Sequence, residues 1–447
     1  MKEILLINMA TPNERANVFS YFAPPLGILS IAAFLELFGH PCDVIDYCHE
    51  RLDLNLLVQK ITKQQITIVG FCVYTLNVDE AMGLAKYLKK TIPNLVTIFG
   101  GPHASLDSAY CIRSRYVDYV LIGEGESAML ELVEAIGSGF SLIPLSYIDG
   151  LCMNQSRVYI NNPARKLILD LDLLPIVKRE GYYAEKYKNI INVSSSRGCP
   201  AKCIYCACSA LAGSRYRVRN IENVVLELSY LKNRFEERIN TIYFIDDTFT
   251  VFKQRVFDFL KLRSKYRLCY NWRCESRIDV IDKELIDSIQ NGGCIAIHFG
   301  IESGSQEVLE KIRKRINLRS AMDIISYCFS KRLPVCCYFI LGHYCDTIDS
   351  MNDTCNLIKE LAERYDVDVS LYFNTPYPGT YQYQHRDELG IRLTSDSYSG
   401  FLVYVPLIET SEFTLDDQRR CYQKVAKYLN IHNFGMVGLL EEHTKTS

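Results

Sequence analysis

The sequence predicts an α/β protein in which a doubly wound, Rossmann-like domain is followed by a partial (β/α)6 barrel. Three observations lead to this prediction. Short continuous runs of Val, Ile and Leu recur along the chain, amphipathic stretches separate them, and several runs end in glycine. Strands that are apolar on both faces are typical of a parallel sheet covered by helices. At 447 residues the chain is long enough for two or three domains.

The first third of the chain alternates strands and helices. Helices are expected over Pro25–Phe38 and Val78–Lys90. The expected strands are Glu3–Asn8, Pro41–Asp46, Ile66–Cys72, Leu95–Gly101 and Tyr119–Gly123. This alternation predicts a doubly wound domain over residues 1–140.

Short turns, most of them containing glycine, lie beside these strands. Ligands of a doubly wound sheet bind outside the carboxyl ends of its strands, where glycine lets a bulky group approach the backbone. The turns are Pro24–Gly27, Tyr74–Asn77, Gly100–His103 and Gly123–Glu126. One glycine turn alone is more often just a turn, but several together predict a ligand site at this edge.

A second region of alternating strands and helices begins near Ile190, after a weakly patterned segment, 141–189, that we expect to be a linker. The expected strands are Ile191–Ser196, Thr241–Asp247, Tyr270–Glu275, Cys294–Glu302, Leu333–Gly342 and Val367–Phe373. The expected helices are Ile221–Phe235, Gln254–Ser264, Lys283–Gln290, Gln306–Arg313, Arg319–Lys331 and Ser350–Glu363. Six such units predict a partial barrel over residues 190–375, with its chemistry at the carboxyl ends of the strands. Residues 376–447, with one helix at Leu415–Asn430, are expected to close the barrel or contact substrate.

Three cysteines lie in one loop-forming run of the second region. Cys199, Cys203 and Cys206 are separated by four and three residues, and Gly198 and Pro200 keep the first thiol in a turn. This spacing suits a cube-shaped 4Fe-4S cluster, in which three cysteines leave one iron open to a substrate or cofactor. Two alternatives stay open: a zinc ion with Cys208 as its fourth ligand, and buried free cysteines without a metal.

Composition restricts the class of protein. The formal net charge is −2 and charges of both signs are interspersed, so we expect no nucleic acid partner and a small-molecule or peptide substrate. The 18 cysteines are spread over a long chain without a signal-peptide pattern, which favours a reducing cytoplasm. The longest apolar stretch, Ile28–Phe38, is too short to span a bilayer.

The cysteine run resembles the signature of the radical S-adenosylmethionine (SAM) superfamily, with Tyr205 as the aromatic residue before the last cysteine. Phe244–Phe249, Phe299–Ser305 and Pro376–Thr380 also resemble segments of that family. In the family, the open iron chelates the amino and carboxylate groups of SAM, and an electron from the cluster cleaves SAM to a 5′-deoxyadenosyl radical. The resemblance implies roles at SAM for Tyr205, Asp247, Arg277, Glu302, Ser303 and Ile340.

Elementary chemistry leaves alternatives for these residues. Asp246 and Asp247 end an apolar strand, where they could bind ribose hydroxyls or cap the next turn. Glu302 follows a buried strand and needs a partner, which could be the SAM ammonium group, Arg277 or a nearby lysine. Tyr205 and Ile340 could equally belong to the core.

Two basic runs lie in this region. Lys311–Arg315 lies at a helix end, where cations suit the helix dipole, so we expect it to face solvent. Arg215–Arg219 follows the cysteine loop and could steer an anionic part of the substrate.

The glycine turns of the first domain jointly resemble the cobalamin-binding domain that precedes one branch of the radical SAM proteins. The resemblance implies cofactor contacts for Thr75, Asn77, Gly100, Gly101, Gly123 and Glu124. The run Asp-x-His-x-x-Gly, which supplies a histidine ligand to cobalt in other cobalamin domains, is missing, and Asp46–His49 has the wrong spacing. Cobalamin is therefore expected to bind in the base-off form, without a histidine ligand to cobalt. His103 is expected at most to face the cofactor.

The resemblance implies a cobalamin-dependent methyltransferase. One SAM would methylate cobalamin, a second would yield the radical, and the substrate radical would collect the methyl group from cobalt. An electron donor such as flavodoxin or ferredoxin is expected. Three alternatives stay open: a cyclase or rearrangement enzyme, a radical enzyme whose first domain is only a scaffold, and a cobalamin or iron-sulfur sensor without enzymatic activity.

Overall fold

This computed structural model describes residues 3–9, 24–48, 50–155, 158–179, 190–235, 239 and 241–429. The chain forms two compact units, Met1–Tyr187 and Lys188–Ser447. Each unit is described by itself below.

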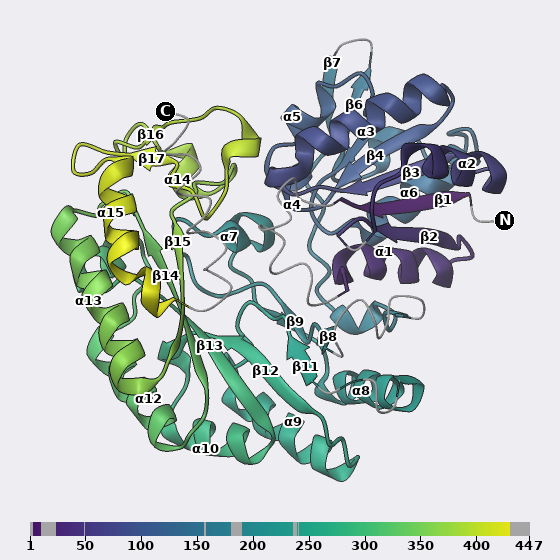
Figure 1. The fold of residues 1–447 in the computed structure, drawn as a ribbon. Coiled ribbons are helices and arrows are strands. Elements are labelled where there is room, and N and C mark those ends of the chain that lie inside the picture. Colours follow the sequence, from purple (N-terminus) through teal and green to yellow (C-terminus); the bar gives the residue numbers. More distant parts are fainter. Residues whose placement is uncertain are drawn as a thin grey trace. The chain divides into compact units, whose positions relative to one another are not determined.

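The first unit contains a seven-stranded sheet in the order β2-β1-β3-β4-β5-β6-β7 (Figure 1). Its strands are β1 (Ile4–Asn8), β2 (Cys42–Asp46), β3 (Ile68–Cys72), β4 (Val96–Gly100), β5 (Tyr119–Leu121), β6 (Leu151–Gln155) and β7 (Val158–Asn161). The first five strands pair in parallel, whereas β6 and β7 are antiparallel. The helices are α1 (Leu26–Leu37), α2 (Leu54–Gln64), α3 (Val78–Thr91), α4 (Pro102–Leu106), α5 (Ser108–Ile112) and α6 (Gly125–Gly137).

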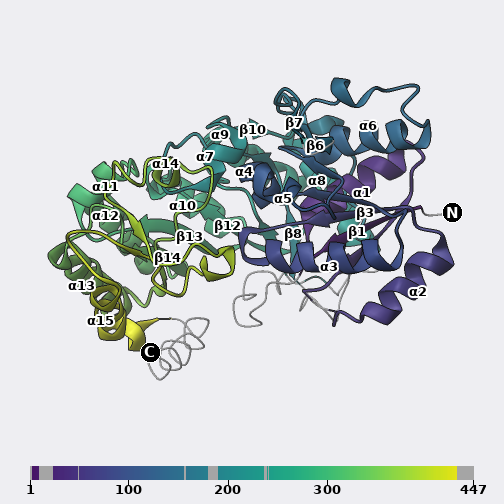
Figure 2. The ribbon, with the colours of Figure 1, turned by 90° about the horizontal axis from the view of Figure 1, so that it is seen from above.

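Helices cover both faces of this sheet, as a doubly wound fold requires. Figure 2 shows α1 and α6 on one face and α2 and α3 on the other. On the first face, Ile28 and Leu29 of α1 and Met129 and Leu132 of α6 pack in one core with strand residues such as Ile98. Burial of these side chains is the main force that holds helices and sheet together.

Several elements of the first unit were not expected from the sequence, namely helices α2, α4, α5 and α6 and strands β6 and β7. Helix α2 begins at an Asp53 cap, whose carboxylate accepts hydrogen bonds from the backbone of Asn55 and Leu56. Strands β6 and β7 lie in the segment for which we expected a linker and extend the sheet at its edge. The side chains of Val158, Tyr159 and Ile160 in β7 are exposed or only half-buried, so the strand lacks the apolar run that marks a buried strand.

The second unit contains a six-stranded, fully parallel sheet in the order β15-β14-β13-β12-β11-β8. Its strands are β8 (Ile190–Val193), β11 (Thr241–Phe244), β12 (Asn271–Ser276), β13 (Cys294–Glu302), β14 (Val335–Leu341) and β15 (Asp368–Phe373). The helices are α7 (Ala207–Ala212), α8 (Ile221–Phe235), α9 (Lys253–Lys265), α10 (Lys283–Asn291), α11 (Gln306–Lys311), α12 (Leu318–Ser330), α13 (Ile348–Tyr365), α14 (Tyr381–Gln384) and α15 (Leu415–Val425). Two short antiparallel pairs, β9 (Ser196–Arg197) with β10 (Arg217–Val218) and β16 (Arg392–Leu393) with β17 (Ile408–Glu409), complete it.

The two faces of this sheet differ in burial. One face is fully buried under the helices along its outer side (Figure 1), where Phe244, Trp272 and Phe259 pack edge to face. The other, which we call the inner face, remains partly exposed. It carries Tyr243, Arg273, Glu275, His298, Tyr338, Ile340 and Tyr372. An aromatic core under the helices and polar side chains on the inner face position a site within the curved sheet.

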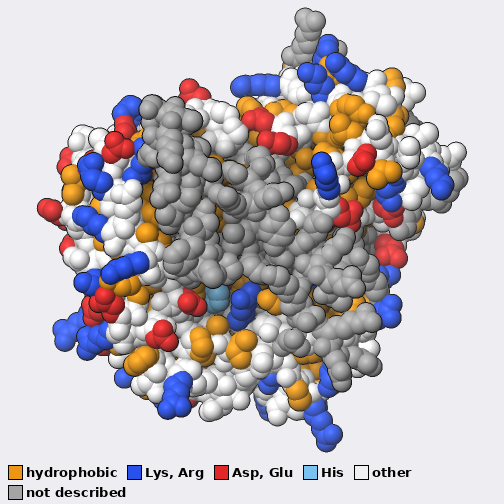
Figure 3. All heavy atoms as spheres, in the orientation of Figure 1, with side chains coloured by type: hydrophobic (Ala, Val, Ile, Leu, Met, Phe, Trp, Pro, Cys, Tyr) orange, Lys and Arg blue, Asp and Glu red, His pale blue; other side chains and the backbone are white. Residues whose placement is uncertain are grey.

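The predicted fold class is confirmed: a doubly wound parallel-sheet domain precedes a domain built on a six-stranded parallel sheet. Within the described residues, no helix combines the length and apolar character needed to cross a membrane. On the face drawn in Figure 3, acidic and basic side chains are interspersed.

Candidate active site

The cysteine loop lies at the carboxyl end of β8, the edge at which a parallel barrel places its chemistry. Gly198 has a φ of +87°, and a Cβ at this position would lie 2.0 Å from the carbonyl oxygen of Arg215. Only glycine fits such a position. The loop is also held by two backbone hydrogen bonds, from Ile204 N to Ile312 O (3.1 Å) and from Gln382 N to Ile204 O (3.1 Å).

The three thiols face different partners. Cys203 is buried, and Nη1 of Arg277 lies 3.8 Å from its Sγ. The Cys199 thiol lies 3.6 Å from Oγ1 of Thr248. Burial, together with negative charge on Cys203, Asp247 and Cys199, raises the pKa of Cys206 to about 12, which places the three thiols in one neighbourhood. A thiolate in such a place is costly unless bound iron compensates its charge.

Within the described residues, no three His, Cys, Asp or Glu side chains are arranged around a point that could hold one metal ion. The single-ion geometry that zinc requires is thus not formed there. A 4Fe-4S cluster makes a different demand, because each cysteine binds its own iron at a separate corner of the cube. The donor set of three neighbouring thiols and an adjacent guanidinium fits such an anionic cluster.

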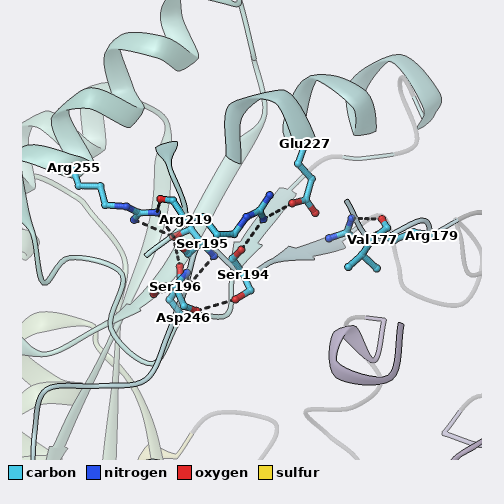
Figure 4. A network of polar contacts seen from close by, with 9 residues as sticks. All are labelled: Val177, Arg179, Ser194, Ser195, Ser196, Arg219, Glu227, Asp246 and Arg255. Carbon is cyan, nitrogen blue, oxygen red and sulfur yellow. Dashed lines mark hydrogen bonds and ion pairs between the residues drawn. The ribbon is translucent and has the colours of Figure 1, made fainter. Parts of the chain in front are cut away.

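Asp246 supports the strand that leads into the cysteine loop (Figure 4). Its carboxylate accepts hydrogen bonds from the backbone and hydroxyl of Ser195 (2.8 and 2.7 Å) and of Ser196 (2.5 and 2.8 Å). Arg255 donates to the Ser195 hydroxyl and carbonyl (3.1 and 2.8 Å). Burial raises the pKa of Asp246, and its hydrogen bonds oppose that rise. Asp246 therefore positions the loop through Ser195 and Ser196, a structural role that differs from the cap of the next turn considered for it.

Asp247 and Arg277 lie nearer to the thiols. Asp247 is exposed, and its Oδ2 accepts a hydrogen bond from the backbone of Gly198 (3.2 Å). Arg277 donates from Nε and Nη2 to both carboxylate oxygens of Asp279 (2.9 and 2.8 Å) while its Nη1 approaches Cys203. The two residues flank the cysteine loop, one negative and one positive.

The buried Glu302 carboxylate forms an ion pair with Lys314. Nζ of Lys314 lies 2.8 Å from Glu302 Oε1, and the two side chains are 7% and 10% exposed respectively. Glu302 has a φ of +74° at a register shift where β13 meets β14. Ser303 is fully buried, and its hydroxyl lies 3.3 Å from that of Thr354. Both residues thus have structural partners at the end of β13, and their contact with SAM stays a prediction.

Tyr205 and Ile340 both lie near the carboxyl end of β14. The Tyr205 ring packs against His343, with ring centroids 5.4 Å apart. Burial raises the pKa of Tyr205, and the neighbouring Glu302 carboxylate adds to the effect. Ile340 is half-buried on the inner face near the end of β14. An aromatic ring and an aliphatic side chain at this edge suit an adenine base.

The expectations for the two basic runs hold only in part. In the run expected to face solvent, Lys311, Arg313 and Arg315 are exposed, whereas Lys314 is buried because it pairs with Glu302. From the run expected to steer substrate, Arg217 is buried, and Arg219 donates to Glu227 (2.5 Å) and to the Ser194 carbonyl (3.0 Å), as Figure 4 shows. Arg219 is therefore occupied by contacts within the second unit.

Sequence reasoning missed two further features. His343 is fully buried just after β14, and in its surroundings, all described, neither ring nitrogen has a hydrogen-bond partner. Arg273 and Glu275 share the inner face of β12, and Arg277 follows this strand directly with an extended backbone. The sequence does carry a signal for this feature. Charged residues at every second position of an extended segment lie on one side, because alternate residues of a strand point the same way.

In the first unit, the glycines at the strand ends leave open backbone. A Cβ at Gly100 or Gly123 would meet no heavy atom within 4 Å. Gly101 differs: with a φ of +95°, its Cβ would lie 3.1 Å from both Cys72 Sγ and the Val73 backbone. Gly123 has a φ of +86° and donates from its backbone to the Ser105 hydroxyl (2.9 Å). Such open, glycine-rich strand ends fit a bulky cofactor.

The other residues expected at this cofactor have internal contacts. The side chain of Asn77 is fully buried, accepts a hydrogen bond from Tyr74 N (2.8 Å) and donates to the Met9 carbonyl (3.0 Å). Glu124 accepts a hydrogen bond from Ile168 N (2.7 Å). Thr75 Oγ1 lies 3.1 Å from Nδ1 of His103, whose ring is fully buried. His49 lies outside the described residues.

Comparison with known proteins decides the family. Residues 193–358 match the model of the radical SAM superfamily, and residues 15–133 match that of the B12 binding domain. An uncharacterized methyltransferase of Pyrococcus horikoshii is 30% identical over 429 residues, covering 94% of this chain and 91% of the relative. The chain belongs to the radical SAM proteins with a B12-binding domain.

One further relative and one solved structure are similar to this chain. The anaerobic magnesium-protoporphyrin IX monomethyl ester cyclase of Rubrivivax gelatinosus is 24% identical over 398 residues, with 86% of this chain and 70% of the cyclase covered. The structure of the methyltransferase TsrM from Kitasatospora setae, with tryptophan and a SAM analogue bound, superposes with a TM-score of 0.77 at 16% identity and covers 96% and 90% of the two chains. At that identity the likeness shows the fold.

The family membership establishes the general chemistry. The protein is a cobalamin-dependent radical SAM enzyme with a 4Fe-4S cluster, SAM and cobalamin as its cofactors. Its relatives are mostly methyltransferases, with some cyclases.

Proposed function

We propose that this radical SAM enzyme is a methyltransferase that acts on an unactivated carbon of a small molecule or peptide. The observation that carries the proposal is the relative of 30% identity, described as a methyltransferase, which aligns along 94% of this chain and so includes both domains. A methyl donor and a radical initiator in one chain provide the two components that methylation of an inert carbon needs.

In the second unit, the thiols of Cys199, Cys203 and Cys206 hold the cluster, which supplies the electron that cleaves SAM. Arg277, beside Cys203, balances the cluster's negative charge. Asp247 accepts hydrogen bonds from the ribose, and Glu302 and Ser303 contact the methionine part of SAM. Tyr205 and Ile340 line the adenine. The support is their common position at the carboxyl end of one parallel sheet.

In the first unit, cobalamin supplies the methyl group and binds base-off, without a histidine ligand to cobalt. Gly100, Gly101 and Gly123 leave room for the corrin at the strand ends, with Thr75, Asn77 and Glu124 around it. Two observations support this assignment: the histidine-ligand motif is missing, and His103 is fully buried beside Thr75. In the paramagnetic resonance spectrum of the cobalt(II) state, we expect no splitting by a nitrogen ligand; a histidine splitting would overturn this assignment.

A flavodoxin or ferredoxin supplies the electron to the cluster. The tail that follows β15 takes part in the site. Helix α14 is hydrogen-bonded to the cysteine loop through Gln382 N and Ile204 O (3.1 Å), which supports a role of residues 376–447 in closing the barrel. The proposed division is a cobalamin domain, 1–140, a connecting segment, 141–189, whose strands β6 and β7 extend the first sheet, a barrel, 190–375, and this tail.

The test is product analysis under anaerobic conditions. Enzyme reconstituted with cluster and cobalamin is incubated with methyl-labelled SAM, a reductant and the small-molecule fraction of its host cells. We expect 5′-deoxyadenosine, S-adenosylhomocysteine and one labelled product. Deoxyadenosine with no methyl transfer would reject the methyltransferase and favour cyclisation or rearrangement. Full activity without cobalamin would reject its role in catalysis.

A further inference from the structure

The inner face of the second unit carries a polar cluster that the proposed chemistry does not use. Its members, here called the inner cluster, come from four adjacent strands: Tyr243 of β11, Arg273 and Glu275 of β12, His298 of β13 and Tyr338 of β14. Glu275 and His298 are direct neighbours in the parallel pairing of β12 with β13.

The inner cluster lies on the same side of the sheet as the cysteine loop. Side chains two residues apart along an extended backbone point to one face. Arg273 and Glu275 of β12 therefore share the side of Arg277, which follows the strand with its backbone still extended. Arg277 in turn reaches Sγ of Cys203 at 3.8 Å. A strand rises about 3.3 Å per residue, so Glu275 lies only about 6–7 Å along β12 from the residue beside the cluster loop. That separation is the size of a small organic molecule.

Hydrogen bonds hold the Glu275 carboxylate in one place. Tyr243 and Tyr338 both donate to its Oε1, Tyr338 at 3.3 Å. Nδ1 of His298 lies 2.6 Å from the Tyr338 hydroxyl. Because Tyr338 gives its proton to Glu275, the His298 tautomer with a proton on Nδ1 completes the chain. The carboxylate is therefore preorganised, which is typical of a binding group rather than of a mobile surface side chain.

The two charges of the inner cluster lack fixed counter-charges. Among the described residues, no Lys or Arg side chain lies within 4.0 Å of the Glu275 carboxylate. Burial raises the pKa of Glu275 to about 7, while Tyr243, Tyr338 and Arg273 oppose that rise. The neighbouring His298, 3.7 Å away, is no cation at neutral pH because burial and Arg273 lower its pKa to about 4.

Arg273 likewise has no fixed counter-charge among the described residues. Its guanidinium lies 4.5 Å from the centre of the Tyr243 ring, and its buried Nε has no acceptor in this described region. It makes no ion pair with Glu275, although both point to the same face. The Glu275 side chain is 25% exposed, so a ligand that enters the inner face can reach it. Such a ligand removes these charges from water, which is costly unless it supplies the missing partners.

Aromatic rings continue beside these charges. The ring centroids of His298 and Tyr338 are 5.8 Å apart, and those of Tyr338 and Tyr372 are 6.3 Å apart. Such a wall suits an aromatic or otherwise apolar side group.

We propose that the inner cluster binds the substrate of this enzyme through a zwitterionic amino-acid group, with the substrate ammonium on Glu275 and the substrate carboxylate on Arg273. This rests on the proposed function and narrows its substrate class to an amino acid with an aromatic or bulky apolar side chain. Arg273 and Glu275 lie two residues apart on β12, and this spacing matches the adjacent charges of an amino-acid group. The substrate carboxylate would neutralise Arg273, and the substrate ammonium would neutralise Glu275.

The test is a calorimetric binding experiment with three matched probes: L-phenylalanine, phenethylamine, which lacks the carboxylate, and 3-phenylpropionate, which lacks the ammonium. The full chain carries its cluster and cobalamin, SAM is saturating so that the probes cannot occupy the open iron, and no reductant is added. We expect phenylalanine to bind roughly tenfold or more tightly than either partial probe.

Two isosteric variants then assign each charge. Glu275→Gln should abolish the preference for phenylalanine over 3-phenylpropionate, and Arg273→Gln the preference over phenethylamine. Glu360→Gln, an exposed glutamate of α13, should bind all three probes like the wild type. Thermal unfolding checks that each variant is folded.

The proposal is overturned if phenylalanine does not bind at about 10 mM, or if each variant keeps the wild-type preference. Binding that SAM abolishes would also overturn it, because the probe would then occupy the open iron. No turnover takes place in this experiment, so its failure is distinct from a failure to form S-adenosylhomocysteine, which would count against the methyltransferase itself.

Discussion

Lys314 and Glu302 form a buried ion pair, with Lys314 Nζ 2.8 Å from Glu302 Oε1. A Cβ at Gly300 would lie 2.4 Å from that oxygen and 2.8 Å from Nζ, so a side chain at this position would displace the paired groups. The pair thus fixes the end of β13, where we place part of the SAM site.

Lys314→Met should destabilise the protein by about 3–5 kcal/mol, because it leaves the Glu302 carboxylate buried without a counter-charge. Lys311→Met is the matched control: Lys311 pairs with Glu307 on the surface, with the two side chains 48% and 75% exposed, so little or no change in stability is expected. Chemical denaturation measures both. Equal effects of the two variants would contradict the importance of the buried pair.

Gly198→Ala should weaken both folding and cluster binding, because its Cβ would overlap the Arg215 carbonyl in a left-handed backbone conformation. A loss of roughly 2–4 kcal/mol is expected. Gly213→Ala provides the comparison, since Gly213 has a φ of +64° but its Cβ would meet nothing within 4 Å; about 1 kcal/mol is expected there. Unfolding and iron content are the measurements, and normal iron content in Gly198→Ala would count against a rigid cysteine loop.

Alanine at Cys199, Cys203 or Cys206 should each reduce iron from about four atoms per chain and abolish SAM cleavage, because each thiol holds one corner of the cluster. Iron analysis and 5′-deoxyadenosine formation are measured after reconstitution. Cys269→Ala, an exposed cysteine, serves as control. Cys208→Ala separates the alternatives: retention of the cluster is expected, and loss of a bound zinc ion would instead support a four-cysteine zinc site.

The stability of the protein should fall as pH drops from about 6.5 to 4, partly because of His343. Burial lowers the pKa of this histidine to about 4, opposed by the nearby Glu302 carboxylate. Between these pH values His343 binds a proton in the unfolded chain but not in the native state. The free energy of unfolding therefore falls by up to about 3 kcal/mol.

His343→Phe keeps a ring against Tyr205 but cannot titrate. Its free energy of unfolding, measured between pH 8 and 4, should therefore decline less steeply than that of the wild type. At pH 8, where the ring is neutral in both states, the slopes of the two proteins should agree. Parallel curves over the whole range would show that His343 is not held neutral by the fold.

Much of the fold was predictable because it follows from local patterns. The strand at Cys294–Glu302 appears with its predicted bounds, since continuous apolar residues followed by glycine and polar turns mark a buried parallel strand. The edge strand β7 escaped prediction because half-exposed strands carry no such pattern. For the site, the cysteine spacing is a local property as well, so its chemistry could be proposed from the chain alone.

Contacts between distant residues could not be predicted in this way. The sequence around Lys314 shows a cation at a helix end, which predicts exposure to solvent. Its burial depends instead on the position of Glu302 in the folded protein, with which it pairs. Likewise, Glu275 joins Tyr243 and Tyr338 only when β11, β12 and β14 are placed in one sheet. The sequence by itself determined the fold class, the thiol loop and the open strand ends, since neighbouring residues encode them. Tertiary structure alone decided which charges are paired and which are left for a ligand, because burial and distance arise from the packing of the whole sheet.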